Sequence, residues 1–396
     1  MKVRSDKYIL VINCGSSSLK FSMHHFNDAE LKISGTINGI GDRTSFFILE
    51  DNQGQETSHK KVNFDNMEGA VEAFIQWLES QPFSVTAIGH RLVQGGPDHR
   101  DPEIITTKLL KRLDEFIYLA PNHLPGELKT IKAFQNAFPR IPQVACFDTA
   151  FHKPLPLVVK HYPLPKTYQH KGLIKYGFHG LSYAYILQKL VAEDQTTLNK
   201  KIIIAHLGNG ASMAAVENGK CLDTTMGLSP TGGLVMGTRS GDLDPGVIIF
   251  LLKQYHLTIT ELDDLLSKQS GMKAIAGISD MQELLAKETI KPKAALAIQI
   301  FCYHAKKQIG ALAAALGGLD LLVFTGGIGA NSPVIREHIC RDLNFLGIEL
   351  NQRANNKGQE TISLNTSRVS VRCLKTNEEL MIAKAVHHVL NHSIKH

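Results

Sequence analysis

Several widespread catalytic and binding patterns are missing from this chain of 396 residues. No Gly-Lys-Ser/Thr follows a glycine-rich run, which excludes a P-loop nucleotide site. No G-x-G-x-x-G opens the first strand–helix unit, which disfavours a dinucleotide-binding fold. The chain also contains neither H-E-x-x-H nor C-x-x-C, so the usual zinc-binding and paired-cysteine signatures are absent.

Long hydrophobic runs and basic clusters are missing as well. The most apolar stretch, residues 310–324, is interrupted by Gly317, Gly318 and Asp320 and is too broken to span a membrane. The net charge of +6 comes from scattered basic residues without interleaved aromatics, so we expect no nucleic-acid partner. The chain begins with a polar segment and not with a signal peptide, and its six unpaired cysteines indicate buried thiols in a reducing compartment. We therefore expect a cytoplasmic protein.

Two segments of the chain share one pattern, a strand, a small polar turn and a returning strand. In the first, Ile9–Ile12 leads into Gly15 and the chain returns over Leu19–Met23; the second covers residues 201–216. Their turns begin at Gly15 and Gly208, which are 208 − 15 = 193 positions apart. This spacing predicts an internal duplication at the scale of a domain. Two such hairpins across a cleft can hold the phosphates of a nucleotide with backbone amides and hydroxyls.

Two further glycine-rich segments indicate anion binding. Residues 226–245 form a glycine-rich loop that contains one arginine, Arg239, beside Asp242 and Asp244. Glycine lets backbone amides approach an anion closely, and a guanidinium offers a fork suited to phosphate or carboxylate. In the second segment, a strand runs into the glycines of residues 326–329, and Ser332 is expected to cap the helix that follows.

The periodicity predicts two α/β halves joined by a hinge, with no long linker between them. We expect an N-terminal domain over residues 1–148, a larger domain over residues 149–377 that carries the glycines of residues 326–329, and a last helix in 378–396 that packs back on the first domain. The apolar pattern predicts helices over residues 67–80, 107–118, 124–137, 180–194, 245–255, 260–268, 293–316, 334–343 and 378–391.

Seven motifs in a fixed order resemble the acetate kinase family. They are Asn13–Lys20 (NCGSSSLK), Phe147–His152 (FDTAFH), Tyr176–Gly180 (YGFHG), His206–Ser212 (HLGNGAS), Met236–Asp242 (MGTRSGD), Phe324–Gly329 (FTGGIG) and Thr376–Leu380 (TNEEL). The resemblance implies an α/β, two-domain actin-like fold, as in sugar kinases and heat-shock chaperone ATPases, with duplicated βββαβα-type cores beside a nucleotide cleft. It also implies reversible, direct in-line phosphoryl transfer from ATP to acetate, giving acetyl phosphate and ADP.

The resemblance assigns roles to individual residues of this sequence. The catalytic residues it implies are Arg91, Asp148, His179 and Arg239, of which His179 and Arg239 stabilise the transition state. The acetate site would comprise Arg91, Val93, Asn122, Phe178 and Pro230. The nucleotide would be bound by Ser16, Ser18, Lys20, His206, Gly208, Asn209, Gly210, Asp280, Gln282, Gly327, Ile328, Gly329 and Asn331.

The same resemblance implies a divalent metal and a homodimer. Asn13 and Glu378 would hold Mg²⁺, for which Mn²⁺ can substitute, with Asp148 close by. A favourable charge at a helix N-terminus is an alternative reason for Glu378. The expected partners are acetate, ATP and a second copy of the chain, without nucleic acid or membrane.

The sequence departs from the family pattern at four positions. Asn122 stands where an apolar residue is expected to line the acetate methyl pocket, and Gln94 stands in place of a histidine. Gln282 and Ala330 replace an arginine and a glutamate near the nucleotide. The departure in the acyl pocket leaves a propionate or butyrate kinase as an alternative. The implied actin-like fold leaves a second alternative from another class, an ATP-dependent binding module without kinase activity.

Overall fold

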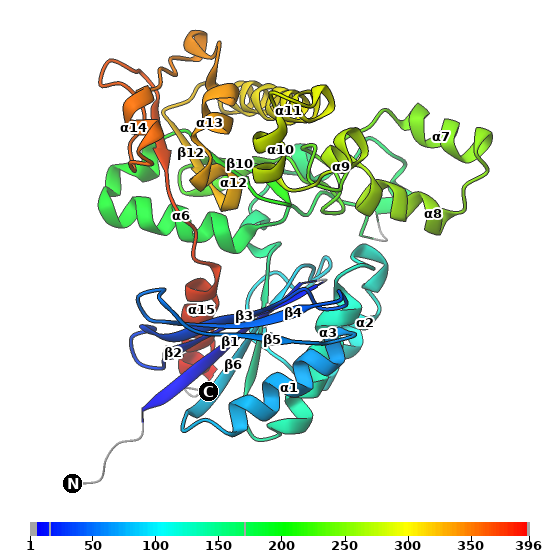
Figure 1. Ribbon diagram of the computed structural model, residues 1–396, viewed down its shortest axis with the longest axis vertical. Helices are drawn as coiled ribbons and strands as arrows, with labels where there is room; N and C mark the ends of the chain where they lie inside the picture. Colours follow the sequence, from blue (N-terminus) through cyan, green and yellow to red (C-terminus); the bar gives the residue numbers. More distant parts are fainter. Residues whose placement is uncertain (1–5, 16, 170–171, 394–396) are drawn as a thin grey trace. The chain divides into compact units, whose positions relative to one another are not determined.

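The computed structural model describes residues 6–15, 17–169 and 172–393, and the chain divides into two compact units. Unit 1 comprises Met1–Ala150 and Asn377–His396, and unit 2 comprises Phe151–Thr376. The sequence predicts these divisions after residues 148 and 377. Figure 1 shows the two units in the colours of the sequence, with the last helix, α15, in red among the blue strands of unit 1.

Unit 1 is built on a mixed sheet whose order, in the described residues, is β5-β4-β3-β2-β1-β6-β8-β7. The predicted hairpin is present, because β1 and β2 pair antiparallel from Tyr8 opposite His25 to Cys14 opposite Leu19. On the other side of β1, the strands β6 and β8 continue the sheet in parallel. The strand bounds are β1 Lys7–Cys14, β2 Ser18–His25, β3 Leu31–Asn38, β4 Ser45–Asp51, β5 Glu56–Val62, β6 Ser84–Leu92, β7 Glu103–Ile104 and β8 Gln143–Phe147.

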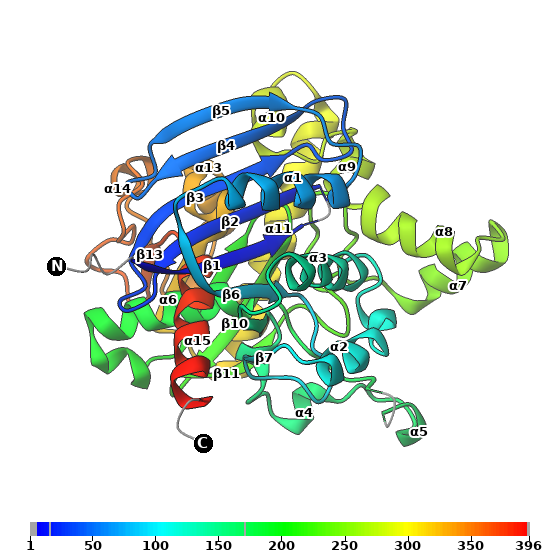
Figure 2. The same cartoon turned by 90° about the horizontal axis from the view of Figure 1, so that it is seen from below.

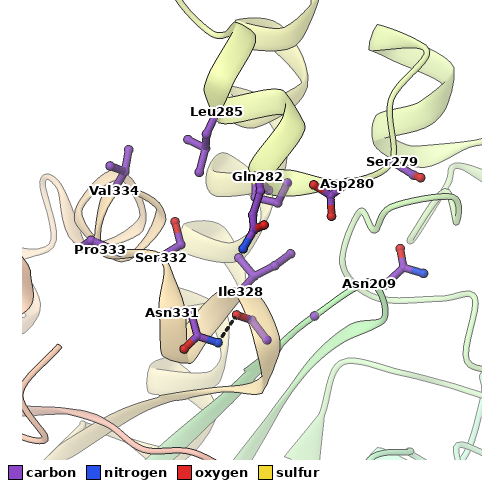
Figure 3. A pocket seen from close by; sticks show the side chains of 13 residues that line it. Asn209, Ser279, Asp280, Gln282, Leu285, Ile328, Asn331, Ser332, Pro333 and Val334 are labelled. Carbon is purple, nitrogen blue, oxygen red and sulfur yellow. Dashed lines mark hydrogen bonds between the residues drawn. The ribbon is translucent and has the colours of Figure 1, made fainter. Parts of the chain in front are cut away.

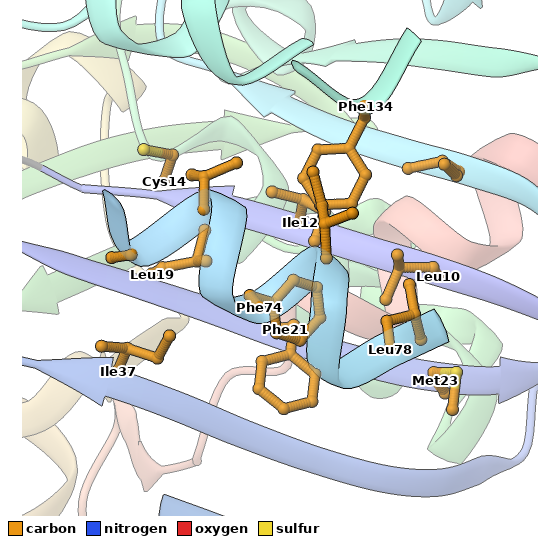
Figure 4. Close-up of a cluster of buried hydrophobic side chains, with 14 of the residues drawn as sticks. Leu10, Ile12, Cys14, Leu19, Phe21, Met23, Ile37, Phe74, Leu78 and Phe134 are labelled. Carbon is orange, nitrogen blue, oxygen red and sulfur yellow. The ribbon is translucent and has the colours of Figure 1, made fainter. Parts of the chain in front are cut away.

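Helices α1 (Met67–Glu79) and α3 (Leu124–Ala137) pack on one face of this sheet. The strands present alternate residues to that face, and Leu10, Ile12 and Phe21 meet Phe74 of α1 and Phe134 of α3 in one buried cluster (Figure 4). The rings of Phe21 and Phe74 lie 4.4 Å apart, so aromatic packing fixes α1 over β2. Helix α2 (Thr107–Asp114) packs beside α3.

The last helix, α15 (Glu378–Ser393), packs against β1, β6, β2 and β8 of unit 1, as Figure 2 also shows. Gly89 on β6 allows this close approach, because a Cβ there would lie 2.5 Å from Ile382 Cγ2 and 2.7 Å from Val386 Cγ2. Both distances are below the contact distance of two carbon atoms. The chain thus returns to unit 1 and places Glu378 at its sheet.

Unit 2 repeats the central part of this topology. Its sheet runs β11-β10-β9-β12-β13, with β9, β10 and β11 antiparallel and β12 and β13 added in parallel beside β9. The order β3-β2-β1-β6-β8 of unit 1 corresponds strand by strand, so the duplication inferred from the sequence is confirmed. The bounds are β9 Ile202–Leu207, β10 Ala211–Glu217, β11 Lys220–Thr224, β12 Leu321–Thr325 and β13 Ser370–Cys373.

Unit 2 has a helix in each of the five ranges predicted within residues 180–343. Its helices are α4 Leu157–Lys160, α5 Lys166–Gln169, α6 Gly180–Glu193, α7 Pro245–Gln254, α8 Ile259–Asp264, α9 Gly271–Ala276, α10 Met281–Lys287, α11 Pro292–Leu316, α12 Gly326–Asn331, α13 Pro333–Cys340 and α14 Gln352–Asn356. Ser332 caps α13 as expected, accepting a hydrogen bond from the backbone N–H of Ile335.

The sequence pattern does not predict α4, α5, α9, α10 or α14, and three further helices differ from the prediction. The glycines after β12 form the helix α12 and not an open turn. Gly326 adopts φ 78°, and its backbone packs so closely against Leu207 that a Cβ on Gly326 would lie 2.6 Å from the Leu207 carbonyl oxygen. Tertiary packing overrides the low helix propensity of glycine there. Helices α2 and α8 end early and continue as a 3₁₀ turn, Ile117–Leu119, and a π turn, Leu265–Gln269.

The six cysteines are buried and unbonded to one another, as expected for reduced thiols. Among the residues that the structure describes, no helix combines the length and apolar character needed to cross a bilayer.

We predict that Gly89→Ala destabilises the protein by about 1–3 kcal/mol, because the added methyl group forces α15 away from β6. Urea unfolding measures the change. Gly126→Ala is the matched control, since a Cβ at Gly126 meets nothing within 4 Å and the change should cost no stability. Equal stability of Gly89→Ala and the parent would contradict the packing described here.

Candidate active site

The polar centre of unit 1 lies where two neighbouring parallel strands end. Arg91 is the penultimate residue of β6, and Asp148 follows β8 directly. The register places Leu92 opposite Phe147, and the N–H of Asp148 donates to the carbonyl of Leu92 at 2.9 Å. The guanidinium therefore meets the carboxylate with two parallel contacts, Nε to Oδ1 at 3.1 Å and Nη2 to Oδ2 at 2.5 Å.

Two further residues from separate elements join this pair. Arg91 Nη1 donates to Asn13 Oδ1 at 3.0 Å, from the end of the adjacent β1. Glu378, the first residue of α15, places Oε2 3.8 Å from Arg91 Nε. The side chain of Asn377 accepts the N–H of Leu380 at 2.9 Å and caps α15, while Glu378 stands in the first turn, where its charge also meets the helix dipole. The structure thus brings Asn13, Arg91, Asp148 and Glu378 together.

Burial and charge determine the protonation of this cluster. Burial alone would lower the pKa of Arg91, yet the charges of Asp148 and Glu378 raise it above its ordinary value, so the guanidinium stays charged. Burial, aided by the charge of Asp148, raises the pKa of Glu378 to about 7, although Arg91 and Lys20 act in the opposite direction. A carboxyl group with such a pKa exchanges its proton readily for another cation.

The remaining predicted residues of unit 1 make no side-chain hydrogen bond to the Arg91 cluster among the contacts described. Lys20 is exposed and reaches Glu378 through its charge, while Ser18 sits in the tight turn in which the Gly15 N–H donates to its carbonyl at 2.8 Å. Val93 is buried just beyond β6, and Asn122 is exposed in the segment before α3. Ser16 lies outside the described residues.

In unit 2, His179 and Arg239 approach the turn between β9 and β10. A Cβ on Gly210 would lie 3.4 Å from His179 Nε2 and 3.6 Å from Arg239 Nη1, so both side chains border one position of the backbone. His206 stacks on His179 with a centroid distance of 4.3 Å, and its Nδ1 lies 2.8 Å from the Ser182 hydroxyl. These three predicted residues are therefore neighbours.

The orientation of His179 is fixed by Ser212 on β10. His179 has φ 58° directly before α6, an uncommon conformation for a residue other than glycine. Its Nδ1 lies 2.8 Å from Ser212 Oγ, which also contacts the hydroxyl of Tyr183. When Tyr183 donates to Ser212 and Ser212 to Nδ1, the ring proton is on Nε2, beside Gly210, where it can be donated to an anion.

The loop around Arg239 is held by its own hydrogen bonds. Arg239 Nη1 donates to the carbonyl of Pro230 at 3.1 Å, and the N–H of Gly233 donates to Asp242 Oδ1 at 2.7 Å. Asp244 caps α7 by accepting the N–H of Gly246. Asp242 and Asp244 thus shape the loop, which leaves Arg239 as its cation beside the turn at Gly210.

A cavity of about 780 Å³ opens beside the same β9–β10 turn (Figure 3). Gln282 points toward Ile328 there, and Asn331 donates to the carbonyl of Gly327 at 2.9 Å. The predicted nucleotide residues that line it are Gly208, Asn209, Asp280, Gln282, Gly327, Ile328 and Asn331. The cavity is of the size that nucleotides and other small ligands occupy.

Three predicted site residues are buried or have a structural role in the fold. Gly329 is buried behind the cavity, and Phe178 is 1% exposed, with its carbonyl bonded to His152 Nε2. Asp280 lines the cavity but also caps α10, accepting the N–H of Glu283 at 2.8 Å.

Sequence reasoning missed three polar residues near these sites. Ser212 ends the motif His206–Ser212 but is assigned no role there, and Glu127 and Arg336 belong to no motif. Arg336 is buried and its Nη1 donates to the carbonyls of Gly329 and Ala330, which supports α12 from behind. Buried charged residues follow no periodic pattern, so only the structure locates them.

Comparisons with known proteins identify a family that this chain matches over most of its length. A sequence model of the Acetokinase family matches residues 8–384. The chain is 41% identical to an acetate kinase of Carboxydothermus hydrogenoformans over 388 residues, covering 95% of this chain and 97% of the relative. Among solved structures, it resembles acetate kinase of Porphyromonas gingivalis with a TM-score of 0.85 at 36% identity, and a propionate kinase of Francisella tularensis with a TM-score of 0.90 at 35% identity. Both cover 97% of this chain and 100% of the other.

We predict that Ser212→Ala lowers kcat on the order of tenfold, because His179 loses the hydroxyl that orients its ring. The KM for nucleotide should change little, since Ser212 is buried and does not line the cavity. Steady-state kinetics and a melting curve measure both effects. A kcat within twofold of the parent, in a folded variant, would show that the ring is oriented by other contacts.

Proposed function

The chain belongs to the acetokinase family, and we propose that it transfers the γ-phosphoryl group of ATP directly, in line, to a carboxylate oxygen of acetate with the help of Mg²⁺. The protein is an enzyme, and its activity is the reversible ATP-dependent phosphorylation of acetate. The alternative of a binding module without kinase activity is thereby set aside.

One observation supports our proposal for the place where the phosphoryl group is transferred. The cavity begins at Gly208 and Asn209, and the next residue, Gly210, is bordered by His179 and Arg239. A nucleotide in the cavity would direct its terminal phosphate toward a histidine N–H and a guanidinium. Phosphoryl transfer depends mainly on positioning and on charge neutralisation, and these two groups supply both.

Unit 1 supplies the residues that we assign to acetate and metal. The Arg91 fork, fixed by Asp148 and Asn13, would bind the acetate carboxylate. The hard oxygens of Asn13, Asp148 and Glu378 suit a divalent cation that keeps several waters, and Mn²⁺ accepts the same ligands. When bound, the cation would neutralise negative charge on the phosphates.

Val93, Asn122, Phe178 and Pro230 remain our proposal for the acyl pocket, and the burial of Val93 and Phe178 leaves little of their surface to shape it. Because the chain also resembles a propionate kinase, the activity must be compared among carboxylates of different chain length. A coupled assay with ATP should give the highest kcat/KM for acetate, ahead of propionate and butyrate. A higher value for propionate would favour the alternative activity.

The proposed homodimer is supported by an uncovered apolar face on unit 2. Helix α7 has no buried residue, and Ile249 and Phe250 on it are 52% and 55% exposed. Tyr255, which follows α7, and Ile259, the first residue of α8, are 65% and 85% exposed (light green in Figure 1). Such a surface is typical of an interface between copies of a chain. The buried free thiols support our further inference that the enzyme works in the cytoplasm.

We predict that Arg239→Ala lowers kcat at least about a hundredfold while the melting temperature stays the same, because a preorganised charge on the transition state is lost. Arg341→Ala, at an exposed arginine of unit 2, is the control and should retain full activity. Activity of Arg239→Ala within tenfold of the parent would remove Arg239 from the mechanism.

We predict that Glu378→Gln raises the magnesium concentration for half-maximal rate on the order of tenfold, since a charged oxygen ligand becomes a neutral amide. Glu30→Gln, at an exposed carboxylate of unit 1, should leave that concentration unchanged. An unaltered magnesium requirement in Glu378→Gln would place the metal elsewhere.

We predict that the double variant Ile249→Glu/Phe250→Glu sediments as a monomer under conditions in which the parent is a dimer, because two charges enter an apolar interface. Phe345→Glu adds one charge at a residue that is 73% exposed on another element and should leave the dimer intact. A parent that sediments as a monomer would contradict the proposed assembly.

A further inference from the structure

Glu127, in the first turn of α3, is a buried carboxyl group to which none of the roles above applies. It is 3% exposed, and both of its oxygens accept from the backbone N–H of Val93, at 3.3 and 3.2 Å. Val93 stands two positions after Arg91, one residue beyond the end of β6. The carboxyl group of Glu127 thus holds the chain at the point where the proposed acetate site begins.

The charges around Glu127 come from several elements. Burial raises the pKa of Glu127 to about 8, with Asp148 acting in the same direction and Arg91 and the Val93 N–H in the opposite one. Cys14 of β1 also interacts with Glu127. Arg91 in turn interacts with Asp148, Glu378 and Glu127. A single guanidinium is therefore shared among three carboxyl groups.

We propose that Glu127 is a positioning residue that sets the affinity for acetate: it fixes Val93 through the backbone and, when ionised, weakens the attraction of Arg91 for an anion. A negative charge on Glu127 competes with the acetate carboxylate for the same guanidinium. By reciprocity, bound acetate makes Glu127 harder to ionise. This inference rests on the proposed acetate site at Arg91.

The direction of the effect with pH follows from this competition. Acetate remains charged throughout the range near neutrality, and Glu127 gains its charge as the pH rises through about 8. The KM for acetate should therefore rise toward alkaline pH, while the KM for ATP, bound by residues of unit 2, should not follow. Glu378 also titrates near this range, so the comparison is made at saturating magnesium.

The test compares the full-length parent with Glu127→Gln, which keeps the shape and the acceptor for the Val93 N–H but cannot ionise. At about pH 9, Glu127→Gln should have a KM for acetate about fivefold below that of the parent, and at about pH 6.5 the two should agree within about twofold. Glu68→Gln, at an exposed carboxylate paired with Lys129 of α3, is the charge-matched control and should follow the parent at both pH values.

Each outcome is decisive. A Glu127→Gln variant that keeps the parent's pH dependence overturns the proposal, and so does a parent whose KM for acetate is constant between the two pH values, which needs no variant at all. Glu127→Asp keeps the charge and should keep the alkaline rise. A structural role alone would lower the melting temperature and change KM equally at both pH values. A parent without acetate kinase activity would instead refute the proposed function.

Discussion

The contact between the Arg91 guanidinium and the Asp148 carboxylate organises the polar end of unit 1. Removing Arg91 would leave the Asp148 carboxylate buried without its ion-pair partner, at a cost of about 3–5 kcal/mol in comparable proteins. The parallel register of β6 and β8 brings the two residues to the same edge of the sheet. Asn13 accepts a hydrogen bond from this cation, and Glu127 and Glu378 interact with it through their charges, so the ionisation of the two carboxyl groups cannot be considered separately.

The sequence predicted the framework because the framework depends on local signals. Alternating or continuous apolar residues marked the strands of both hairpins, and the spacing of the two turns revealed the duplication that the sheet orders confirm. Helix α3 begins and ends at the predicted residues, and Ser332 caps α13 as expected. The motifs then pointed to Arg91 and Asp148, which the structure places in contact.

The sequence could not predict what depends on distant packing. From sequence alone, Glu127 is expected to face solvent on its helix. Only the packing of α3 against the end of β6 shows that its carboxyl group is buried and accepts the Val93 N–H. Ser212 follows a strand pattern that says nothing of the histidine it touches. The helix formed by residues 326–331 contradicts the propensity of its glycines, since contact with β9 stabilises it. In each case the missing information is the neighbour across the fold.

The return of α15 to unit 1 has a consequence for the order in which the chain acquires structure during synthesis. Unit 2 is continuous in sequence, so all of its strands have left the ribosome before α15 emerges. Until α15 emerges, the apolar surface around Gly89 that it will cover is exposed to water, and Arg91 lacks the carboxylate of Glu378. Unit 1 is thus begun before unit 2 and completed after it, and the time for which its apolar surface stays exposed depends on how fast unit 2 is translated.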